Sequence, residues 1–331
     1  MNEVYHRFRR AEHGGKGIVR SGYLDFSASL NPCPPALDWH LPDDNISKYP
    51  DDSYAELKEV IARHHHRNAE EITVGNGSAE VIRTLCHTIL SPGTTACIPP
   101  HTFSEYALSA SLAGASVITS PRAQTRITFL CNPDNPSGIL IGRAGVLKKR
   151  DDLTTCGSLL CVDEAFIDLA DPDESVSDIR DSGMFVLRSL TKSFSMAGAR
   201  FGYGIGDADL INAMEVMRPP WSVNAFAESM AIQAFRHYPE LEESRRYIRQ
   251  ERERISSRCR EMGLHPSPAS ANFILLETGM SASTLVAAME REGILIRDCT
   301  SFDLPSSVRV AVRRRDENTL MLEALERCMP S

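Results

Sequence analysis

LRSLTKSFSMAGARFGY, residues 187–203, places a lysine shortly after an apolar run, with small residues next and Arg200 eight positions after Lys192. A lysine held in a protein-lined cleft beside a fixed cation has a lowered pKa, which suits an amine that condenses with a carbonyl group. A surface lysine in a polar loop is the ordinary alternative, because most lysines remain in water. On this segment alone both interpretations stay open.

A second segment, LCVDEAF at residues 160–166, places Asp163 at the end of another apolar run. Open α/β sheets bind ligands at the carboxyl ends of their strands, and a buried carboxylate needs a cationic or hydrogen-bonding partner. The nitrogen of a pyridinium ring is such a partner. An aspartate that only caps the next helix is the common alternative.

Two turns that could bind a ligand precede Asp163 in the sequence. VGNGSAE, residues 74–80, predicts a strand, a glycine-rich turn and a helix whose first N–H groups can bind an anion. CNPDNPSG, residues 131–138, predicts two Asn- and Pro-rich turns after a strand. Each turn is a weak signal by itself, since ordinary loops use the same residues.

Short apolar, β-branched runs recur along the chain with helical stretches between several of them. Strands that are apolar on both faces predict a largely parallel sheet covered by helices, which is α/β architecture. The predicted strands are 72–74, 96–98, 116–119, 127–131, 159–162, 185–187 and 201–205, followed near the C-terminus by 273–276, 294–297 and 308–312. The predicted helices are 54–66, 79–90, 222–235, 239–262, 281–292 and 317–328.

Together and in this order, the four quoted segments resemble the fold-type-I pyridoxal-phosphate enzymes, the aspartate aminotransferase superfamily, over nearly the whole chain. The resemblance implies a large α/β domain with a mostly parallel seven-stranded sheet between helices, a small α+β domain, and pyridoxal 5′-phosphate as cofactor. It also implies that Lys192 forms a Schiff base with the cofactor and that Asp163 keeps the ring nitrogen protonated. The further cofactor contacts that it implies are Gly77, Ser78, Ala79, Phe103, Asn135, Ser189 and Arg200.

The same resemblance distributes these contacts over the cofactor and implies a second subunit. Gly77, Ser78, Ser189 and Arg200 hold the phosphate, Ala79 adds an N–H, Phe103 stacks on the ring and Asn135 meets its O3′ atom. Tyr49 resembles the tyrosine that reaches the phosphate in the neighbouring subunit, which implies a homodimer with shared active sites. One residue departs from the pattern: Phe166 stands where many of these enzymes have a tyrosine, so one hydroxyl to O3′ is missing.

Substrate choice depends on residues outside this cofactor core. Arg297 and Arg309 both fall in predicted apolar strands, where a guanidinium is costly unless it meets an anion. A phosphorylated amino acid, which carries both a carboxylate and a phosphate, would satisfy both arginines. Internal salt bridges to Asp or Glu are the alternative for either one.

The N-terminal residues narrow the resemblance further. His13-Gly14-Gly15, with the segments 48–51, 220–225 and 294–299, resembles the L-threonine O-3-phosphate decarboxylases of cobalamin biosynthesis, whose near relatives are the histidinol-phosphate aminotransferases. That resemblance implies substrate contacts from His13, Gly14, Asn135, Arg297 and Arg309. Ser29 stands where that family has asparagine, and its shorter side chain reaches a ligand only through water. A histidinol-phosphate-type aminotransferase is the alternative, and a regulator that keeps the fold for effector binding is a third possibility.

Composition sets the broad class of the protein. The chain has 331 residues, 42% of them hydrophobic and 24% charged, with 36 Lys+Arg against 44 Asp+Glu, a net charge of −8. This excess of acidic residues gives no reason to expect nucleic acid or an anionic membrane as partner. The nine cysteines include no C-x-x-C pair and favour reduced thiols in the cytoplasm. No metal site is expected, and His64–His66 predicts a solvated helix end.

These patterns divide the chain into three parts. Residues 1–44 are predicted to be an N-terminal arm that joins the small domain. Residues 45–220 are predicted to be the large cofactor-binding domain. Residues 221–331 are predicted to form a long connecting helix and the small C-terminal α+β domain.

Overall fold

A computed structural model describes residues 8, 10–11, 14–15, 22–38 and 47–329. Its main feature is a sheet of seven strands in the order β2-β8-β7-β6-β5-β3-β4. Strand β8 is antiparallel to both of its neighbours and the other pairs are parallel. The mostly parallel seven-stranded sheet predicted from the sequence is confirmed. The strands are β2 (Ile72–Asn76), β3 (Thr95–Cys97), β4 (Ser116–Ile118), β5 (Thr125–Cys131), β6 (Leu159–Asp163), β7 (Met184–Arg188) and β8 (Phe201–Ile205).

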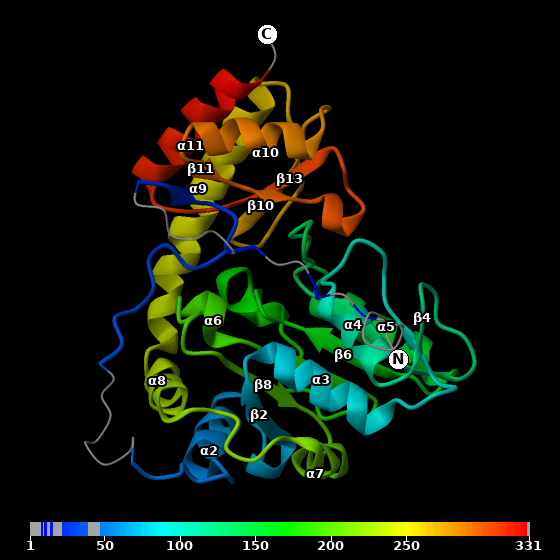
Figure 1. The fold of residues 1–331 in the computed structure, drawn as a ribbon. Helices are drawn as coiled ribbons and strands as arrows, with labels where there is room; N and C mark the ends of the chain where they lie inside the picture. Colours follow the sequence, from blue (N-terminus) through cyan, green and yellow to red (C-terminus); the bar gives the residue numbers. More distant parts are fainter. Residues whose placement is uncertain (1–7, 9, 12–13, 16–21, 39–46, 330–331) are drawn as a thin grey trace.

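Helices cover both faces of this sheet, because successive side chains of its central strands alternate between two hydrophobic cores. In β7, for example, Met184 and Val186 join one core while Phe185 and Leu187 join the other. One face packs against α3 (Ser78–Ile89), α4 (Glu105–Leu112) and α7 (Ala208–Met217). The other face lies under α2 (Ala55–His64), α5 (Arg143–Thr154) and α8 (Ala225–Arg236) (Figure 1).

A smaller α+β unit follows α9 (Leu241–Glu261), the long helix that runs between the two parts of the molecule (Figure 1). Its four-stranded antiparallel sheet has the order β12-β13-β10-β9. The strands are β9 (His265–Pro266), β10 (Phe273–Glu277), β12 (Arg297–Asp298) and β13 (Ser307–Ala311), and the helices that pack on them are α10 (Ala282–Arg291) and α11 (Arg315–Cys328). The domain boundaries at 44/45 and 220/221 stay a prediction.

The predicted single strand 294–297 is wrong, because the chain changes sheets within it. Ile294 and Leu295 form β11, which pairs in parallel with β1 (Leu24–Asp25). Arg297 then begins β12, which pairs with β13. Between them the Ile296 side chain is buried in the core, which fixes the crossing point.

The prediction of a solvated end at His64–His66 is also wrong for one residue. His65 is buried, and its two ring nitrogens lie 2.9 Å from the Ser177 hydroxyl and 2.8 Å from the Tyr203 hydroxyl. Burial, with help from the Arg188 charge, holds the pKa of His65 well below its usual value. His65 is therefore a neutral core histidine that joins α2 to the sheet.

The short helical elements complete the chain. They are α6 (Leu190–Ser193) and the 3₁₀ turns Ala69–Glu71, Ile167–Leu169, Pro172–Glu174, Tyr238–Glu240 and Thr300–Phe302. Among the described residues, no helix has the length and apolar character needed to cross a membrane. Nor does the described part of the chain bring three or more His, Cys, Asp or Glu side chains into a cluster suited to a metal ion.

Candidate active site

A cleft of about 520 Å³ opens at the carboxyl ends of the parallel strands. The small unit lines its opposite side with Arg297, Phe302 and Arg309. Strand ends of an α/β sheet are where such folds bind ligands. Most of the residues singled out from the sequence line this cleft. They are Gly14, Ser29, Ser78, Ala79, Phe103, Asn135, Asp163, Ser189, Lys192, Arg200, Arg297 and Arg309.

Lys192 lies in the single turn α6 that follows β7. The Ser189 hydroxyl caps this turn by accepting the Thr191 N–H, and Asn31 anchors it from the N-terminal arm. The Asn31 N–H donates to the Lys192 carbonyl at 3.0 Å, and its side-chain amide donates to the Ser193 carbonyl at 2.7 Å. Burial, together with the charges of Arg309 and Arg200, lowers the pKa of Lys192 to about 8. A substantial fraction of this amine is neutral near physiological pH, as a nucleophile must be.

Asp163 is the last residue of β6 and is buried at the floor of the cleft. Its Oδ2 accepts the Tyr106 hydroxyl at 2.5 Å and its Oδ1 accepts the Ala165 N–H at 3.0 Å. Burial raises the pKa of this carboxyl to about 6, against the two hydrogen bonds, which favour the ionised form. The carboxylate is therefore aimed into the cleft as an acceptor for a cationic partner.

An anion cradle forms where β2 turns into α3. Gly77 precedes the helix with a φ of +80°, and a Cβ there would lie 2.5 Å from Nη2 of Arg200. The N–H groups of Ser78 and Ala79, in the first turn, have no acceptor within the helix. A guanidinium and free N–H groups at a helix start suit a phosphate. Gly77, which does not line the cleft itself, lets Arg200 approach this point.

Aromatic rings form two walls of the cleft. Phe103 lines one side, and its ring meets Tyr106 edge-on with centroids 5.5 Å apart. Phe166 lies on another side, with the Lys192 amine 5.8 Å from its ring centroid. Phe166 packs against Phe273 of the small unit. The position that lacks a tyrosine hydroxyl therefore does face the lysine.

Arg297 and Arg309 face each other across the antiparallel pair β12–β13, and both line the cleft. Arg309 donates to the Asn135 side-chain oxygen and to the Ser27 carbonyl, the latter at 3.3 Å, and lies 4.8 Å from the Phe273 ring centroid. Burial, and then the neighbouring Arg297 charge, lowers the pKa of Arg309 to about 10. Among the described residues no carboxylate forms a salt bridge with Arg309.

The N-terminal arm contributes the rest of the wall. Gly14 packs against Ser27 of the same arm so closely that a Cβ would lie 2.2 Å from the Ser27 carbonyl oxygen, and it would lie 3.6 Å from Cδ of Arg297 in the small unit. The buried Ser29 hydroxyl lines the cleft and has no hydrogen-bond partner among the described residues. His13 lies outside the residues that the structure describes. Tyr49 lies away from the cleft, 79% exposed and stacked on Trp221 at 4.5 Å.

Comparison with known proteins agrees with this geometry. The family model "Aminotransferase class I and II" matches residues 23–325. The chain belongs to this family. Its members are pyridoxal-phosphate-dependent, so the cofactor predicted from the sequence is confirmed.

Three relatives illustrate the similarity to this aminotransferase family. A protein of Caldanaerobacter subterraneus subsp. tengcongensis, named "Putative threonine-phosphate decarboxylase", is 34% identical over 95% of this chain and 93% of its own length. A histidinol-phosphate aminotransferase of Symbiobacterium thermophilum is 30% identical over 85% of this chain and 82% of its own. The solved histidinol-phosphate aminotransferase of Clostridium acetobutylicum is 27% identical, with a TM-score of 0.79, covering 91% of this chain and 97% of that one.

The cleft fits the cofactor of the aminotransferase family. The close approach of Arg200 to Gly77 brings a guanidinium beside two N–H groups that have no acceptor within the helix. Lys192 supplies an amine with a lowered pKa, and Asp163 supplies a buried carboxylate on the same cleft wall. These groups match the phosphate, the aldehyde and the ring nitrogen of pyridoxal phosphate.

Two cleft residues, Phe302 and Ser27, and one residue behind the cleft, Tyr106, are missing from the sequence interpretation. Tyr106 resembles any core aromatic in a helix, so nothing marks it as the partner of Asp163. Phe302, which lies beside Arg297 with the guanidinium 5.4 Å from its ring centroid, follows no recognisable motif. Ser27 could have been found, because it lies in the same small polar run as Ser29.

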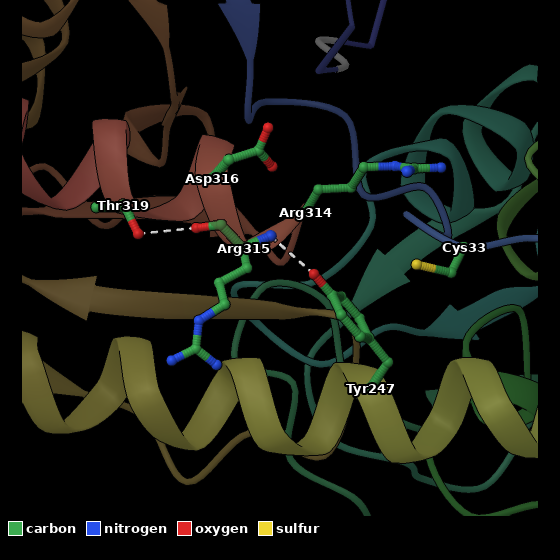
Figure 2. Close-up of a pocket in the computed structure, with 6 residues that line it drawn as sticks. All are labelled: Cys33, Tyr247, Arg314, Arg315, Asp316 and Thr319. Carbon is green, nitrogen blue, oxygen red and sulfur yellow. Dashed lines mark hydrogen bonds between the residues drawn. The ribbon is translucent and has the colours of Figure 1, made fainter.

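A second hollow lies between α9, the start of α11 and Cys33 (Figure 2). There the Arg315 N–H donates to the Tyr247 hydroxyl at 2.7 Å, and the Thr319 hydroxyl donates to the Arg315 carbonyl at 2.8 Å. Arg314 and Asp316 complete its lining. It contains none of the predicted site residues, and its arginines serve below as controls.

Proposed function

We propose that this chain is a pyridoxal-phosphate-dependent decarboxylase that converts L-threonine O-3-phosphate into (R)-1-aminopropan-2-yl phosphate and CO₂, for cobalamin biosynthesis. The observation that carries the proposal is the pair Arg297 and Arg309, which face each other in the cleft that holds Lys192. Arg309 has no carboxylate partner among the described residues, and a cleft lined by two guanidinium groups suits a substrate with two anionic groups. Threonine phosphate has a carboxylate and a phosphate and so matches both arginines in one molecule. Histidinol phosphate has a phosphate alone, and an aminotransferase would use both arginines only with its 2-oxo acid.

The cofactor-binding residues take the following roles. Ser78, Ala79, Ser189 and Arg200 hold the phosphate, Gly77 makes room for that contact, and Phe103 and Asn135 hold the ring. Bound pyridoxal phosphate supplies an electrophilic aldehyde and a cationic ring that accepts the electron pair released at the substrate Cα. Lys192 is the amine that holds the aldehyde, and Asp163 keeps the ring nitrogen protonated.

The substrate residues take roles that follow from their positions. Arg309, pinned by Asn135 and the Ser27 carbonyl, binds the carboxylate. Arg297, beside Gly14, binds the phosphate. The substrate contact of His13 is proposed from the family resemblance alone. The Ser29 hydroxyl, which has no partner among the described residues, binds through a water molecule.

The choice between the two reactions depends on how the chain orients the bonds at Cα. Decarboxylation requires Arg309 to hold the carboxylate in the orientation from which CO₂ departs, after which the Lys192 amine returns a proton to Cα. Transamination requires the Cα–H bond in that orientation instead. Buried and fixed by two hydrogen bonds, Arg309 is a rigid clamp of the kind that such orientation needs.

We also propose a homodimer in which Tyr49 reaches the cofactor phosphate of the other subunit. Tyr49 lies in an exposed apolar group, with Trp221 stacked on it and Val216 81% exposed nearby in sequence. An exposed aromatic and aliphatic group of this kind is typical of an interface. Sedimentation measures the mass, and mixed dimers of Tyr49→Phe and Lys192→Ala test whether the sites are shared. The free cysteines support a reducing cytoplasm as the setting.

The alternative is a histidinol-phosphate-type aminotransferase, favoured by the relatives of that name. The test is to incubate the holoenzyme with L-threonine phosphate and no 2-oxo acid, and to measure CO₂ and aminopropanol phosphate. A decarboxylase forms many equivalents of CO₂ per site. An aminotransferase converts its bound cofactor once and then stops, which would overturn the proposal. Histidinol phosphate with 2-oxoglutarate is the reciprocal assay.

A further inference from the structure

The Asp163 carboxylate is held by a tyrosine from another element. Tyr106, in α4, donates its hydroxyl to Oδ2 of Asp163 at 2.5 Å, and the Ala165 N–H occupies the other oxygen. Both residues are buried. A hydroxyl aimed at a carboxylate favours the ionised form and fixes the direction of its remaining lone pairs.

Tyr106 is itself rigidly placed. Its ring stacks on Phe129 with centroids 4.6 Å apart and planes 14° apart, and Phe103 meets it edge-on. Burial and the Asp163 charge raise the pKa of Tyr106 well above its usual value, so the hydroxyl keeps its proton and stays a donor. Phe103 and Tyr106 are three residues apart, so one segment supplies both a side wall of the cleft and the hydrogen bond to Asp163 behind it.

The groups around Asp163 shift its pKa in opposite directions. Burial raises its pKa, Tyr106 gives the largest lowering effect, and the Ala165 N–H and the Lys192 charge add to it. The Glu164 charge raises it, although that carboxylate pairs with Arg188. The thiols of Cys131 in β5 and Cys161 in β6 stay neutral, because burial holds their pKa values well above the usual range. Tyr106 is thus the main counterweight to burial.

We propose that Tyr106 is a positioning residue that acts through Asp163, keeping this carboxylate ionised and aimed at the ring nitrogen of the cofactor. The inference rests on the proposed pairing of Asp163 with that nitrogen, and it holds for either reaction. An acid that takes the proton for itself leaves the ring less cationic and a weaker acceptor of electrons. Removal of the Tyr106 hydroxyl therefore weakens catalysis without touching the substrate.

The variant is Tyr106→Phe, with Tyr203→Phe as the matched control. Tyr203 is equally buried in the same domain, but its hydroxyl contacts His65. In cofactor-free protein, isotope-edited infrared titration follows the Asp163 carboxyl, whose band is assigned by its loss in Asp163→Asn. We expect Tyr106→Phe to raise the pKa of Asp163 by about 1, since a charged hydrogen bond is lost. Tyr203→Phe leaves it unchanged.

In the holoenzyme, Tyr106→Phe is expected to lower kcat about tenfold and leave the KM for L-threonine phosphate within about twofold. The absorption band of the bound cofactor shifts in the same direction as in Asp163→Asn. Equal titration of Asp163 in wild type and Tyr106→Phe, or an equal shift in Tyr203→Phe, overturns the inference. A pKa shift in the cofactor-free protein combined with a normal cofactor band in Asp163→Asn instead counts against the role of Asp163.

A reciprocal measurement applies even if Tyr106→Phe does not fold. Asp163→Asn removes the charge that raises the Tyr106 pKa. Ultraviolet difference titration should then show one tyrosine that ionises at lower pH in Asp163→Asn than in wild type. Identical tyrosine titration curves for the two proteins contradict the coupling.

Discussion

Two buried arginines, one in each part of the molecule, show how surroundings separate a structural cation from one that awaits a ligand. Arg188, at the end of β7, pairs with Glu164 at 2.8 Å and with Asp168. Despite burial, Asp168, the neighbouring tyrosines and Glu164 hold the pKa of Arg188 well above its usual value. Arg309, in β13, has an amide and a carbonyl as its hydrogen-bond acceptors among the described residues, and its pKa is lowered to about 10.

The difference lies in charge compensation. Arg188 pairs with two carboxylates, Glu164 and Asp168, that lie just beyond the end of β6, so it ties the segment after Asp163 to the end of β7. Arg309 has neighbours that orient it without neutralising it. A buried charge without a counter-charge is costly, and a ligand anion removes that cost. This contrast can be tested by changing each arginine in turn.

The largest effect is expected from Arg188→Met. The change leaves Glu164 and Asp168 as unpaired buried carboxylates, so unfolding free energy should fall by about 3–5 kcal/mol. Urea unfolding of the cofactor-free protein measures it. Arg309→Met, the matched substitution, should stay within about 1 kcal/mol of wild type because no carboxylate loses its partner. An equal loss in both variants would erase the distinction between the two arginines.

Arg309→Gln should lower kcat/KM, whereas Arg188→Met should lower the free energy of unfolding. Loss of a buried, charge-assisted contact to the substrate carboxylate is expected to reduce kcat/KM for L-threonine phosphate about 10²–10³-fold. The control is Arg314→Gln, which removes an exposed guanidinium from the second hollow and should leave kcat/KM unchanged. Steady-state CO₂ release measures both variants. A loss below about threefold for Arg309→Gln would contradict its role as the anion clamp.

Lys192 provides a third cation, partly buried in the cleft, and the free energy that its charge costs the fold should depend on pH. Its pKa is lowered from 10.5 to about 8, so the folded protein holds this proton less tightly than the unfolded chain does. Lys192→Met should therefore stabilise the cofactor-free protein at pH 7, by about 1–3 kcal/mol.

The stability gained by Lys192→Met should be complete below pH 8 and should shrink as pH rises from about 8 towards 10.5. In that range the wild-type lysine loses its charge in the folded state. Urea unfolding across this pH range measures it. Lys148→Met, at an exposed lysine of α5, is the control and should show no such trend. A difference that grows with pH would mean that Lys192 is stabilised, not penalised, by its surroundings.

The smallest effect is expected at the cradle. Gly77→Ala places a Cβ 2.5 Å from Nη2 of Arg200. It also forces an alanine to adopt a backbone φ of +80°. Backbone strain of this kind costs about 1–3 kcal/mol. Displacement of Arg200 should also raise the Kd for pyridoxal phosphate about tenfold, measured by equilibrium dialysis. Gly157→Ala, at a positive φ with nothing nearby, separates strain from displacement: it should lower stability but leave cofactor affinity unchanged.

The sequence predicts the sheet well because its strands are apolar on both faces and bounded by turns. Lys192 and Asp163 are also predictable, since each follows an apolar strand with residues that suit one chemistry. The cross-strand pairing of Arg297 with Arg309 is different, because strand register depends on pairing between distant segments. The strand that carries Arg309 could be predicted, but the short strand that begins at Arg297 and the face-to-face placement of the two arginines required the structure.

Residues that act through another residue are the least predictable. Tyr106 and His65 are ordinary core types by composition, and only their hydrogen bonds distinguish them. The break between β11 and β12 is hidden for a similar reason: the run 294–297 is locally uniform, and the partner of its first half lies near residue 24. The roles assigned to individual site residues stay predictions until the variants above are measured.

The parallel pairing of β1 with β11 has a consequence for synthesis on the ribosome. Leu24 and Asp25 must wait for Ile294 and Leu295, which leave the exit tunnel some 270 residues later. Until then Ser27 and Ser29, which follow β1 directly, lack the strand pairing that holds them at the cleft, so the cleft is completed only after residue 295 has emerged. A nascent chain stalled before residue 294 would hold a folded large sheet but no finished pocket.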